Sequence, residues 1–316
     1  MRAPDFWRHD GGLATLLSPL AWGYGVLASA RRGLTRPQKA ACPVVCVGNL
    51  VAGGAGKTPV ALDLGRRLMM RGRRVHYLSR GYGGSTPGPI RVDPVEHDAR
   101  WVGDEPLLLA ALAPTGVARN RPAGARAAVA AGADVIVMDD GFQNPSLIKD
   151  LSLVVIDGAY GFGNGRMLPA GPLREPVADG LARADGVVVM GEGSAWRDGL
   201  AGFVKPILHG VLAPAPGAAS LAGKAVLAFA GIARPEKFFE TLEAMGCRLV
   251  GAHGFPDHHS FSADEIMTLV EIANAQEAVA VTTEKDHVRL PAEARPMVEA
   301  LRVEIEIGRA SCRERV

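Results

Sequence analysis

A glycine-rich segment followed by lysine and threonine is the part of the sequence best suited to chemistry. Residues 48–58 read GNLVAGGAGKT, after an apolar run at 44–47 and before a helical pattern at about 59–70. Inward-turned backbone N–H groups and the N-terminus of the following helix can hold phosphate oxygens. The groups predicted to do so are those of Gly53, Gly54, Ala55 and Gly56. Lys57 can then reach the terminal phosphates of ATP, and the Thr58 hydroxyl can hold Mg²⁺.

One position in this segment departs from the usual P-loop pattern. That pattern, G-x-x-x-x-G-K-[ST], has glycine where this chain has Val51. Gly53 and Gly54 must then supply the flexibility of the turn. A glycine-rich turn that merely ends in lysine is the alternative, but the strand before and the helix after are the context that a P-loop requires.

Two adjacent carboxylates end another apolar run. Residues 135–138 are predicted to form a buried strand, and Asp139 and Asp140 follow it directly. The carboxyl ends of parallel strands meet at one edge of a sheet, so Asp139 should face the loop at Lys57. Carboxylates in this place hold Mg²⁺ in P-loop enzymes. An ordinary Asp-Asp-Gly turn is the alternative interpretation.

Two further groups could exchange a proton with a substrate. Asp104 and Glu105 precede a helical segment, and phosphoryl transfer to a hydroxyl needs a carboxylate that accepts its proton. Helix capping also explains these residues and is favoured on spacing alone. His258 lies in the loop sequence FPDHHSF at 255–261, where a carboxylate could orient it. Adjacent histidines in a loop are, however, more commonly exposed to solvent.

The elements that must position these groups alternate between strands and helices. Strands are predicted at 44–47, 75–78, 135–138, 153–156, 187–190, 225–230 and 278–282, and helices at 59–70, 107–112, 123–131 and 236–245. Such alternation indicates an α/β fold: a P-loop NTPase-like parallel sheet with helices on both faces, and a second, smaller α/β unit.

The length of 316 residues allows two domains, and the proline-rich stretch at 213–217 marks a boundary. We expect an N-terminal interfacial helix region over 1–40, a P-loop domain over 41–220, a smaller C-terminal α/β domain over 221–308 and a tail over 309–316. The net charge of +2 is too small to indicate nucleic-acid binding, and the four cysteines lack the paired spacing of a metal site.

The segment 11–30 contains no charged residue. It is long enough to span a bilayer, but a proline and several glycines dilute its apolar character. Residues 28–30 resemble a signal-peptidase site, yet acidic residues precede the segment, arginines follow at once, and an ATP site needs the cytoplasm. We therefore expect an interfacial helix on the cytoplasmic side of the inner membrane, or else a helix packed under the core. The residues predicted to face anionic lipid are Arg31, Arg32, Arg36 and Lys39.

Several motifs together resemble the tetraacyldisaccharide 4'-kinases of lipid A synthesis. In the family's order they are KTP at 57–59 after the glycine loop, LSRGYG at 78–83, GDEP at 103–106, DDGFQ at 139–143, LPAGPLREP at 168–176, FPDHH at 255–259 and TEKD at 283–286. The resemblance covers the chain to about residue 307. It implies a monotopic inner-membrane enzyme with two α/β/α domains and the active site between them. It also implies transfer of the ATP γ-phosphate, with Mg²⁺, to the 4'-hydroxyl of a tetraacylated glucosamine disaccharide 1-phosphate.

The resemblance also implies roles for individual residues. Lys57 and Thr58 match the residues that serve phosphate and Mg²⁺, Asp104 matches the catalytic carboxylate, and His258 matches the histidine that pairs with it. The polar residues around metal and substrate match Glu105, Asp139, Asp140 and Gln143, and Arg174 matches an arginine assigned to the substrate or its phosphate. The family usually has histidine where this chain has Asn144, so proton transfer at that position is not expected here.

The expected reaction has Asp104, oriented by His258, accepting the hydroxyl proton during in-line transfer. Two other functions share part of this pattern. A P-loop ATPase or GTPase acting as a switch or metallochaperone would hydrolyse nucleotide without a lipid acceptor, although no Asn-Lys-x-Asp guanine-reading motif is visible. A non-catalytic membrane-surface adaptor would leave Lys57, Asp139 and Asp104 unexplained.

Overall fold

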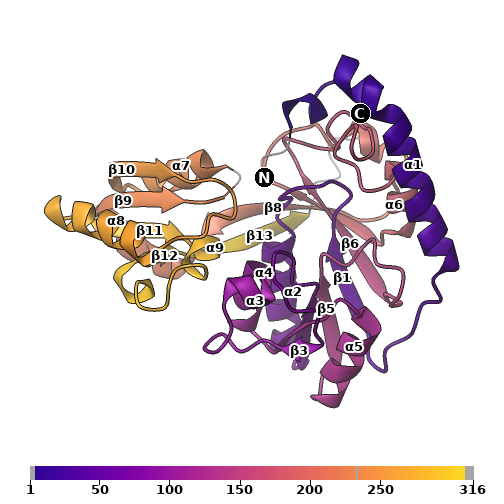
Figure 1. Ribbon diagram of the computed structural model, residues 1–316, viewed down its shortest axis with the longest axis horizontal. Helices are drawn as coiled ribbons and strands as arrows, with labels where there is room; N and C mark the ends of the chain where they lie inside the picture. Colours follow the sequence, from indigo (N-terminus) through magenta and orange to yellow (C-terminus); the bar gives the residue numbers. More distant parts are fainter. Residues whose placement is uncertain (1–3, 233, 310–316) are drawn as a thin grey trace.

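A computed structural model describes residues 4–232 and 234–309 of the chain. It contains two sheets side by side, each with its own helices (Figure 1). The larger sheet has nine strands in the order β13-β8-β7-β6-β1-β5-β2-β4-β3. Their bounds are β1 Val44–Gly48, β2 Val75–Ser79, β3 Ile90–Arg91, β4 Thr115–Val117, β5 Val135–Asp139, β6 Leu151–Asp157, β7 Gly186–Met190, β8 Ile207–Pro214 and β13 Val303–Arg309. The strands from β8 to β4 run parallel, and β13 and β3 are antiparallel to their neighbours.

Helices cover both faces of the larger sheet because its strands are apolar on both sides. In β5, Ile136 and Met138 belong to one core cluster and Val135 and Val137 to the other. Helices α5 (Arg121–Ala130) and α6 (Val177–Arg183) pack on the first face, and α2 (Lys57–Met70) and α4 (Asp104–Ala110) pack on the second. The short helix α3 (Ala99–Val102) comes directly before α4. This arrangement confirms the α/β fold predicted from the alternation of apolar strands and helices.

The smaller sheet has four parallel strands in the order β10-β9-β11-β12. Their bounds are β9 Ala225–Ala230, β10 Arg248–Gly254, β11 Val279–Thr283 and β12 Glu299–Leu301. Helix α7 (Pro235–Ala244) covers one face and α8 (Ala263–Ala275) the other, while the one-turn α9 (Glu284–His287) follows β11. Four 3-10 helices complete the described elements: η1 Asp5–Trp7, η2 Asp198–Leu200, η3 Pro216–Leu221 and η4 Arg295–Met297.

The smaller unit is inserted between two strands of the larger sheet. The sequence predicts that the second unit extends to residue 308, but the chain returns earlier, because β13 pairs antiparallel with β8. The alternation of Val303, Ile305 and Ile307 with exposed Glu304 and Glu306 explains this, since it is the pattern of a half-covered antiparallel edge strand. Apart from Arg309, the predicted tail lies outside the described residues.

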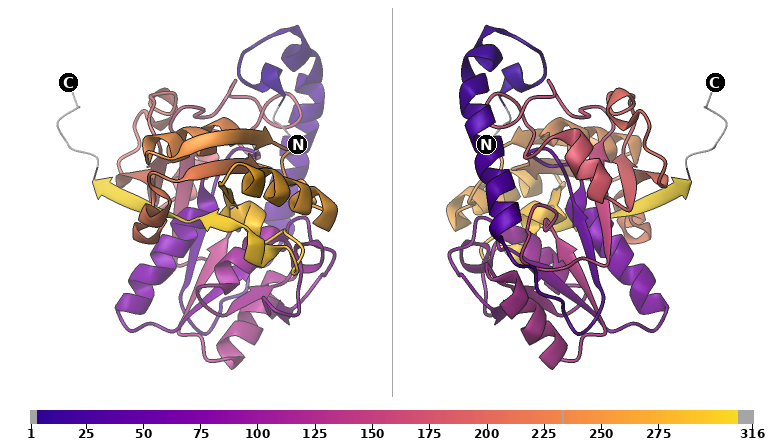
Figure 2. Two further views of the ribbon diagram at one scale, coloured as in Figure 1. Left: turned by 90° about the vertical axis from the view of Figure 1, so that its left-hand side faces the viewer. Right: turned by 90° about the vertical axis from the view of Figure 1, so that its right-hand side faces the viewer.

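Helix α1 (Gly12–Leu34) lies along the outside of the larger unit (Figure 2, right). Most of the residues that face the protein are small. They recur with the helical period, and they are Ala14, Ser18, Ala21, Gly25 and Ala28, with Leu17 beside them. A side chain at Gly25 would meet the Met167 side chain, with a Cβ only 2.6 Å from Cε. Large apolar side chains point outward instead: Leu13, Leu16, Leu20, Trp22, Val26 and Leu27 are exposed. The helix therefore presents its apolar surface away from the core.

Candidate active site

The phosphate loop joins β1 to α2, as the sequence predicts. Gly53 has φ 120° and Gly56 has φ 83°, both in the left-handed region that favours glycine. Lys57 and Thr58 begin α2 directly after Gly56, and both side chains are buried. The position expected to need glycine, Val51, is instead extended and forms a β-bridge with Leu173. Valine suits such a paired, buried strand position, which explains the departure from the usual pattern.

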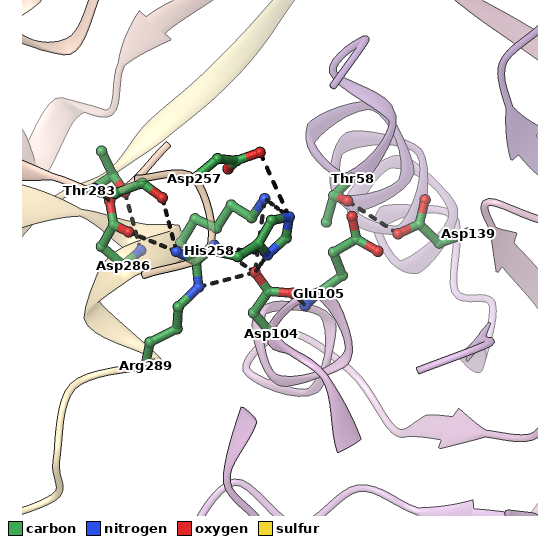
Figure 3. A network of polar contacts seen from close by, with 11 residues as sticks. Thr58, Asp104, Glu105, Asp139, Asp257, His258, Thr283, Asp286 and Arg289 are labelled. Atoms are coloured by element: carbon green, nitrogen blue, oxygen red, sulfur yellow. Dashed lines mark hydrogen bonds and ion pairs between the residues drawn. The ribbon is translucent and has the colours of Figure 1, made fainter. Parts of the chain in front are cut away.

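Thr58 and Asp139 form one side of the site. The Thr58 hydroxyl donates to Asp139 Oδ2 at 3.1 Å (Figure 3). The other oxygen of Asp139 is buried and has no hydrogen-bond partner. Burial and the neighbouring carboxylate of Glu105 raise the pKa of Asp139, Lys57 opposes both effects only in part, and together they leave the pKa at about 8. Burial likewise raises the pKa of Glu105, with Lys57 opposing it.

These residues fit a magnesium ion. The unpaired oxygen of Asp139 is buried beside the Thr58 hydroxyl, and a buried carboxylate oxygen needs a cation or a hydrogen-bond donor as its partner. Mg²⁺ is commonly held by one or two carboxylates, with substrate phosphates and water completing its shell. Within residues 4–232 and 234–309 no three His, Cys, Asp or Glu side chains form a metal cluster. Thr58 and Asp139 would therefore be the protein ligands, and nucleotide phosphates would supply others.

Asp140 has a different environment from Asp139, although the sequence predicts both as metal ligands. Its Oδ1 accepts a hydrogen bond from Arg174 at 2.8 Å and lies 3.9 Å from Lys57 Nζ. Burial raises the pKa of Asp140, but Lys57 and Arg174 outweigh that effect and hold it below its usual range. Asp140 also has φ 47°, an uncommon conformation for aspartate that turns it away from the strand direction. The structure thus pairs Asp140 with cations of the protein.

Gln143 and Arg174 lie beside the phosphate loop, next to this pair. Gln143 Nε2 donates to the Asn49 carbonyl at 2.7 Å and to Glu175 Oε1 at 3.0 Å, and Arg174 reaches Gln143 Oε1 at 3.5 Å. The neighbouring Asn144 makes a local turn instead, because its Oδ1 accepts from Ser146 N at 3.0 Å. The amide at this position therefore shapes the loop.

Asp104 is the central acceptor on the other side of the site. It is 5% exposed. Three nitrogen atoms of the smaller unit lie close to its Oδ2: Arg289 Nη2 at 2.6 Å, His258 Nδ1 at 3.2 Å and Lys285 Nζ at 3.7 Å (Figure 3). Burial raises the pKa of Asp104, but the His258 hydrogen bond and the charges of Lys285 and Arg289 outweigh it. They hold the pKa well below its usual range. Asp104 is therefore a charged acceptor shared by both units.

His258 is held in an unusual backbone conformation. Its φ of 61° is uncommon for histidine, and such outliers concentrate at functional sites. The ring contacts Asp104 through Nδ1, while Nε2 lies 3.4 Å from Lys285 Nζ and 3.9 Å from Asp257. Figure 3 shows Glu105 between the Asp104–His258 pair and the Thr58–Asp139 pair. The residues predicted as acid–base and metal groups thus come together from separate elements.

Sequence reasoning missed two cations of this cluster. Lys285 lies within the TEKD motif but was given no role, and Arg289 lies outside every motif. Arg289 is 6% exposed and also donates to Asp286 Oδ1 at 2.9 Å and to the Gly231 carbonyl at 3.0 Å. The sequence gives no signal for Arg289, which lies in the turn after α9, where its N–H donates to the Asp286 carbonyl at 2.8 Å.

The raised pKa of Asp139 predicts how stability depends on pH in the metal-free protein. The folded chain binds this proton more tightly than the unfolded chain, so the stabilisation is greatest below the ordinary value of 3.8 and is lost as pH rises towards about 8. Chemical unfolding in EDTA should show the free energy of unfolding falling over this interval, by at most about 1.4 kcal/mol per pH unit from this group.

Asp139→Asn should remove much of that slope, whereas Asp264→Asn, a control in the exposed first turn of α8, should leave it unchanged. Equal slopes in the wild type and Asp139→Asn would show that Asp139 is ionised throughout.

The whole chain is similar to proteins of one kind. The family described as tetraacyldisaccharide-1-P 4'-kinase matches residues 13–316. A tetraacyldisaccharide 4'-kinase of Rhodospirillum centenum is 58% identical over 311 residues, covering 96% of this chain and 92% of that protein. One of Paramagnetospirillum magneticum is 54% identical, covering 97% and 94%. The "apo" form of LpxK from Aquifex aeolicus, crystallised in complex with ATP, superimposes with a TM-score of 0.74 at 27% identity over 94% of this chain and 96% of that chain.

Proposed function

The chain belongs to the tetraacyldisaccharide-1-phosphate 4'-kinase family, and we propose that it transfers the γ-phosphate of ATP to the 4'-hydroxyl of a tetraacyl glucosamine disaccharide 1-phosphate. One observation supports the assignment to this site above all. The proton-accepting pair Asp104–His258 comes from two separate units and lies opposite Thr58 and Asp139, with Glu105 between them. A switch ATPase or a metallochaperone does not need such a pair, because it has no hydroxyl acceptor.

The chain's own side chains divide the reaction between them. Lys57 and the phosphate-loop amides bind and orient the terminal phosphates. Thr58 and Asp139 would hold Mg²⁺, which supplies charge neutralisation on the phosphate oxygens when bound. Arg174 and Lys57 both contact Asp140 in this structure. Arg174 therefore lies near Lys57 and would stabilise the charge of substrate or phosphate.

The proton of the acceptor hydroxyl goes to the Asp104–His258 pair. The sequence points to Asp104 as the base, with His258 as its orienting group. The geometry supports a role for both residues in accepting the proton, because three donors already contact Asp104 Oδ2 and weaken it as a base. We infer that the pair acts as one unit: the buried Asp104 charge orients the imidazole and stabilises it when it carries the extra proton.

Loss of either member of this pair should lower turnover without preventing nucleotide binding. Asp104→Asn and His258→Ala should each reduce kcat by about 10²–10⁴-fold, while the Kd for Mg·ATP changes by about threefold or less, because neither side chain is in the phosphate loop. The double variant should cost no more than the worse single variant, since the two residues act together.

Radiolabelled transfer to a detergent-dispersed acyl disaccharide measures these rates, and calorimetry gives the Kd. His253→Ala, which changes an exposed histidine of β10, is the matched control and should retain turnover. Wild-type turnover in Asp104→Asn would exclude this carboxylate from the mechanism.

We further propose that α1 lies in the cytoplasmic face of the inner membrane. Gly12–Leu34 is long and apolar enough to cross a bilayer, but its small-residue face packs lengthwise on the protein, which a spanning helix could not do. Its outward leucines and Trp22 would enter the headgroup boundary. The acylated sugar would remain anchored there while its 4'-hydroxyl reaches the site.

Membrane binding should depend on the outward leucines of α1. Burying a leucine contributes about 1.5–3 kcal/mol, so Leu16→Glu and Leu20→Glu should each weaken sedimentation with phosphatidylethanolamine–phosphatidylglycerol vesicles by about tenfold or more. Met70→Glu places the same charge on an exposed apolar residue at the end of α2 and serves as the control. Equal losses in all three variants would show that α1 is not the membrane-binding surface.

A further inference from the structure

One loop lies between α1 and the phosphate loop and contacts both. We call residues 166–175 the bridging loop. On the phosphate-loop side, Arg174 N donates to the Leu50 carbonyl at 2.8 Å, and Ala52 N donates to the Pro172 carbonyl at 2.7 Å. The Val51–Leu173 bridge lies between these two hydrogen bonds. The bridging loop is therefore paired, as a short strand, with the first half of the phosphate loop.

The same loop is fastened to the N-terminal region at several points. Arg166 binds Asp10 at 2.7 Å and also donates to Ser18 of α1. Met167 fits against the bare backbone of Gly25. At the far end of the helix, Arg32 forms an ion pair with Glu175. A movement of α1 relative to the larger unit would consequently move this loop.

Glu175 is the group through which such a movement reaches the nucleotide site. Its side chain is 1% exposed, and a carboxylate so deeply buried must remain paired. Arg183 binds it at 2.6 Å and Gln143 at 3.0 Å, and the same Gln143 nitrogen donates to the Asn49 carbonyl at the start of the phosphate loop. The path from Arg32 to the phosphate loop thus contains only Glu175 and Gln143.

The ion pair also corrects an expectation about α1. The sequence predicts that Arg32 faces anionic lipid together with Arg31. Arg31 is exposed, but Arg32 is 23% exposed and turned onto Glu175. Two adjacent arginines of one helical turn therefore have different roles, because only one of them contacts the buried carboxylate.

We propose that Arg32 and Glu175 are positioning residues that couple the seating of α1 on a membrane to the geometry of the phosphate loop. The membrane-bound enzyme then binds Mg·ATP more tightly than the same enzyme in solution, and nucleotide strengthens membrane binding by the same factor. This inference rests on the proposed function, in which α1 contacts the bilayer. It adds that the membrane contact changes the affinity of the site for Mg·ATP, besides holding the enzyme near its lipid substrate.

The test compares Arg32→Gln with Arg31→Gln in the full-length protein. Both remove one positive charge from the same turn, but only Arg31 is exposed, so Arg31→Gln should weaken binding to phosphatidylethanolamine–phosphatidylglycerol vesicles at least as much as Arg32→Gln. The Kd for Mg²⁺ with a non-hydrolysable ATP analogue is measured with and without saturating vesicles. Vesicles should tighten binding by about fivefold or more in the wild type and in Arg31→Gln, and by less than about twofold in Arg32→Gln.

Two further variants separate coupling from simple loss of structure. Arg32→Lys keeps the charge opposite Glu175 and should restore part of the vesicle effect. Glu175→Gln keeps the side chain's shape and should abolish the effect, with thermal unfolding reporting whether it remains folded. On vesicles, Arg32→Gln should raise KM for ATP with little change in kcat, because the proton-transfer pair is untouched.

Vesicle tightening that persists in Arg32→Gln, or that is absent from the wild type, would overturn the coupling. Transfer to a detergent-dispersed acceptor tests the proposed function separately. If the wild type phosphorylates that acceptor but shows no vesicle effect, the kinase assignment stands and only the coupling fails.

Discussion

The structure depends on a single buried negative charge that neither unit can satisfy alone. Asp104 belongs to the larger unit, yet its cationic and imidazole partners all come from the smaller one. Leaving a buried carboxylate unpaired costs several kcal/mol. The group that we propose for proton transfer therefore also links the two sheets. A second ion pair, between Arg234 and Asp157 at the end of β6, also joins the two units.

The nucleotide site balances charge in a similar way. Lys57 and Arg174 both contact Asp140, so two cations suited to a polyphosphate are already arranged around one protein carboxylate. Asp139 has the opposite problem, because its free oxygen is buried without a partner. Asp140 thus has two cationic partners, whereas one oxygen of Asp139 has none. This difference separates two adjacent aspartates that look equivalent in the sequence.

Seven strands (β1, β2, β5, β6, β7, β9 and β11) and most covering helices could be predicted from the sequence, because a parallel sheet buried on both faces consists of continuous apolar runs. The predicted strand at 135–138 and helix at 236–245, for example, match β5 and α7 to within one residue. The remaining strands, β3, β4, β8, β10, β12 and β13, were not predicted. The insertion of the smaller unit was missed because β13 pairs with a strand some ninety residues earlier in the chain. The motifs predicted Asp104, His258, Lys57 and Asp139 as site residues. Arg289 and the Arg32–Glu175 pair escaped notice because long-range ion pairs leave no spacing in the sequence.

The return of the chain to β8 bears on how the protein is made. A ribosome must finish the entire smaller unit before β13 emerges, so the larger sheet exposes the unpaired edge of β8 for that interval. An open strand edge is a template for pairing with other chains. The insertion thus lengthens the time for which the nascent chain exposes an unpaired strand edge.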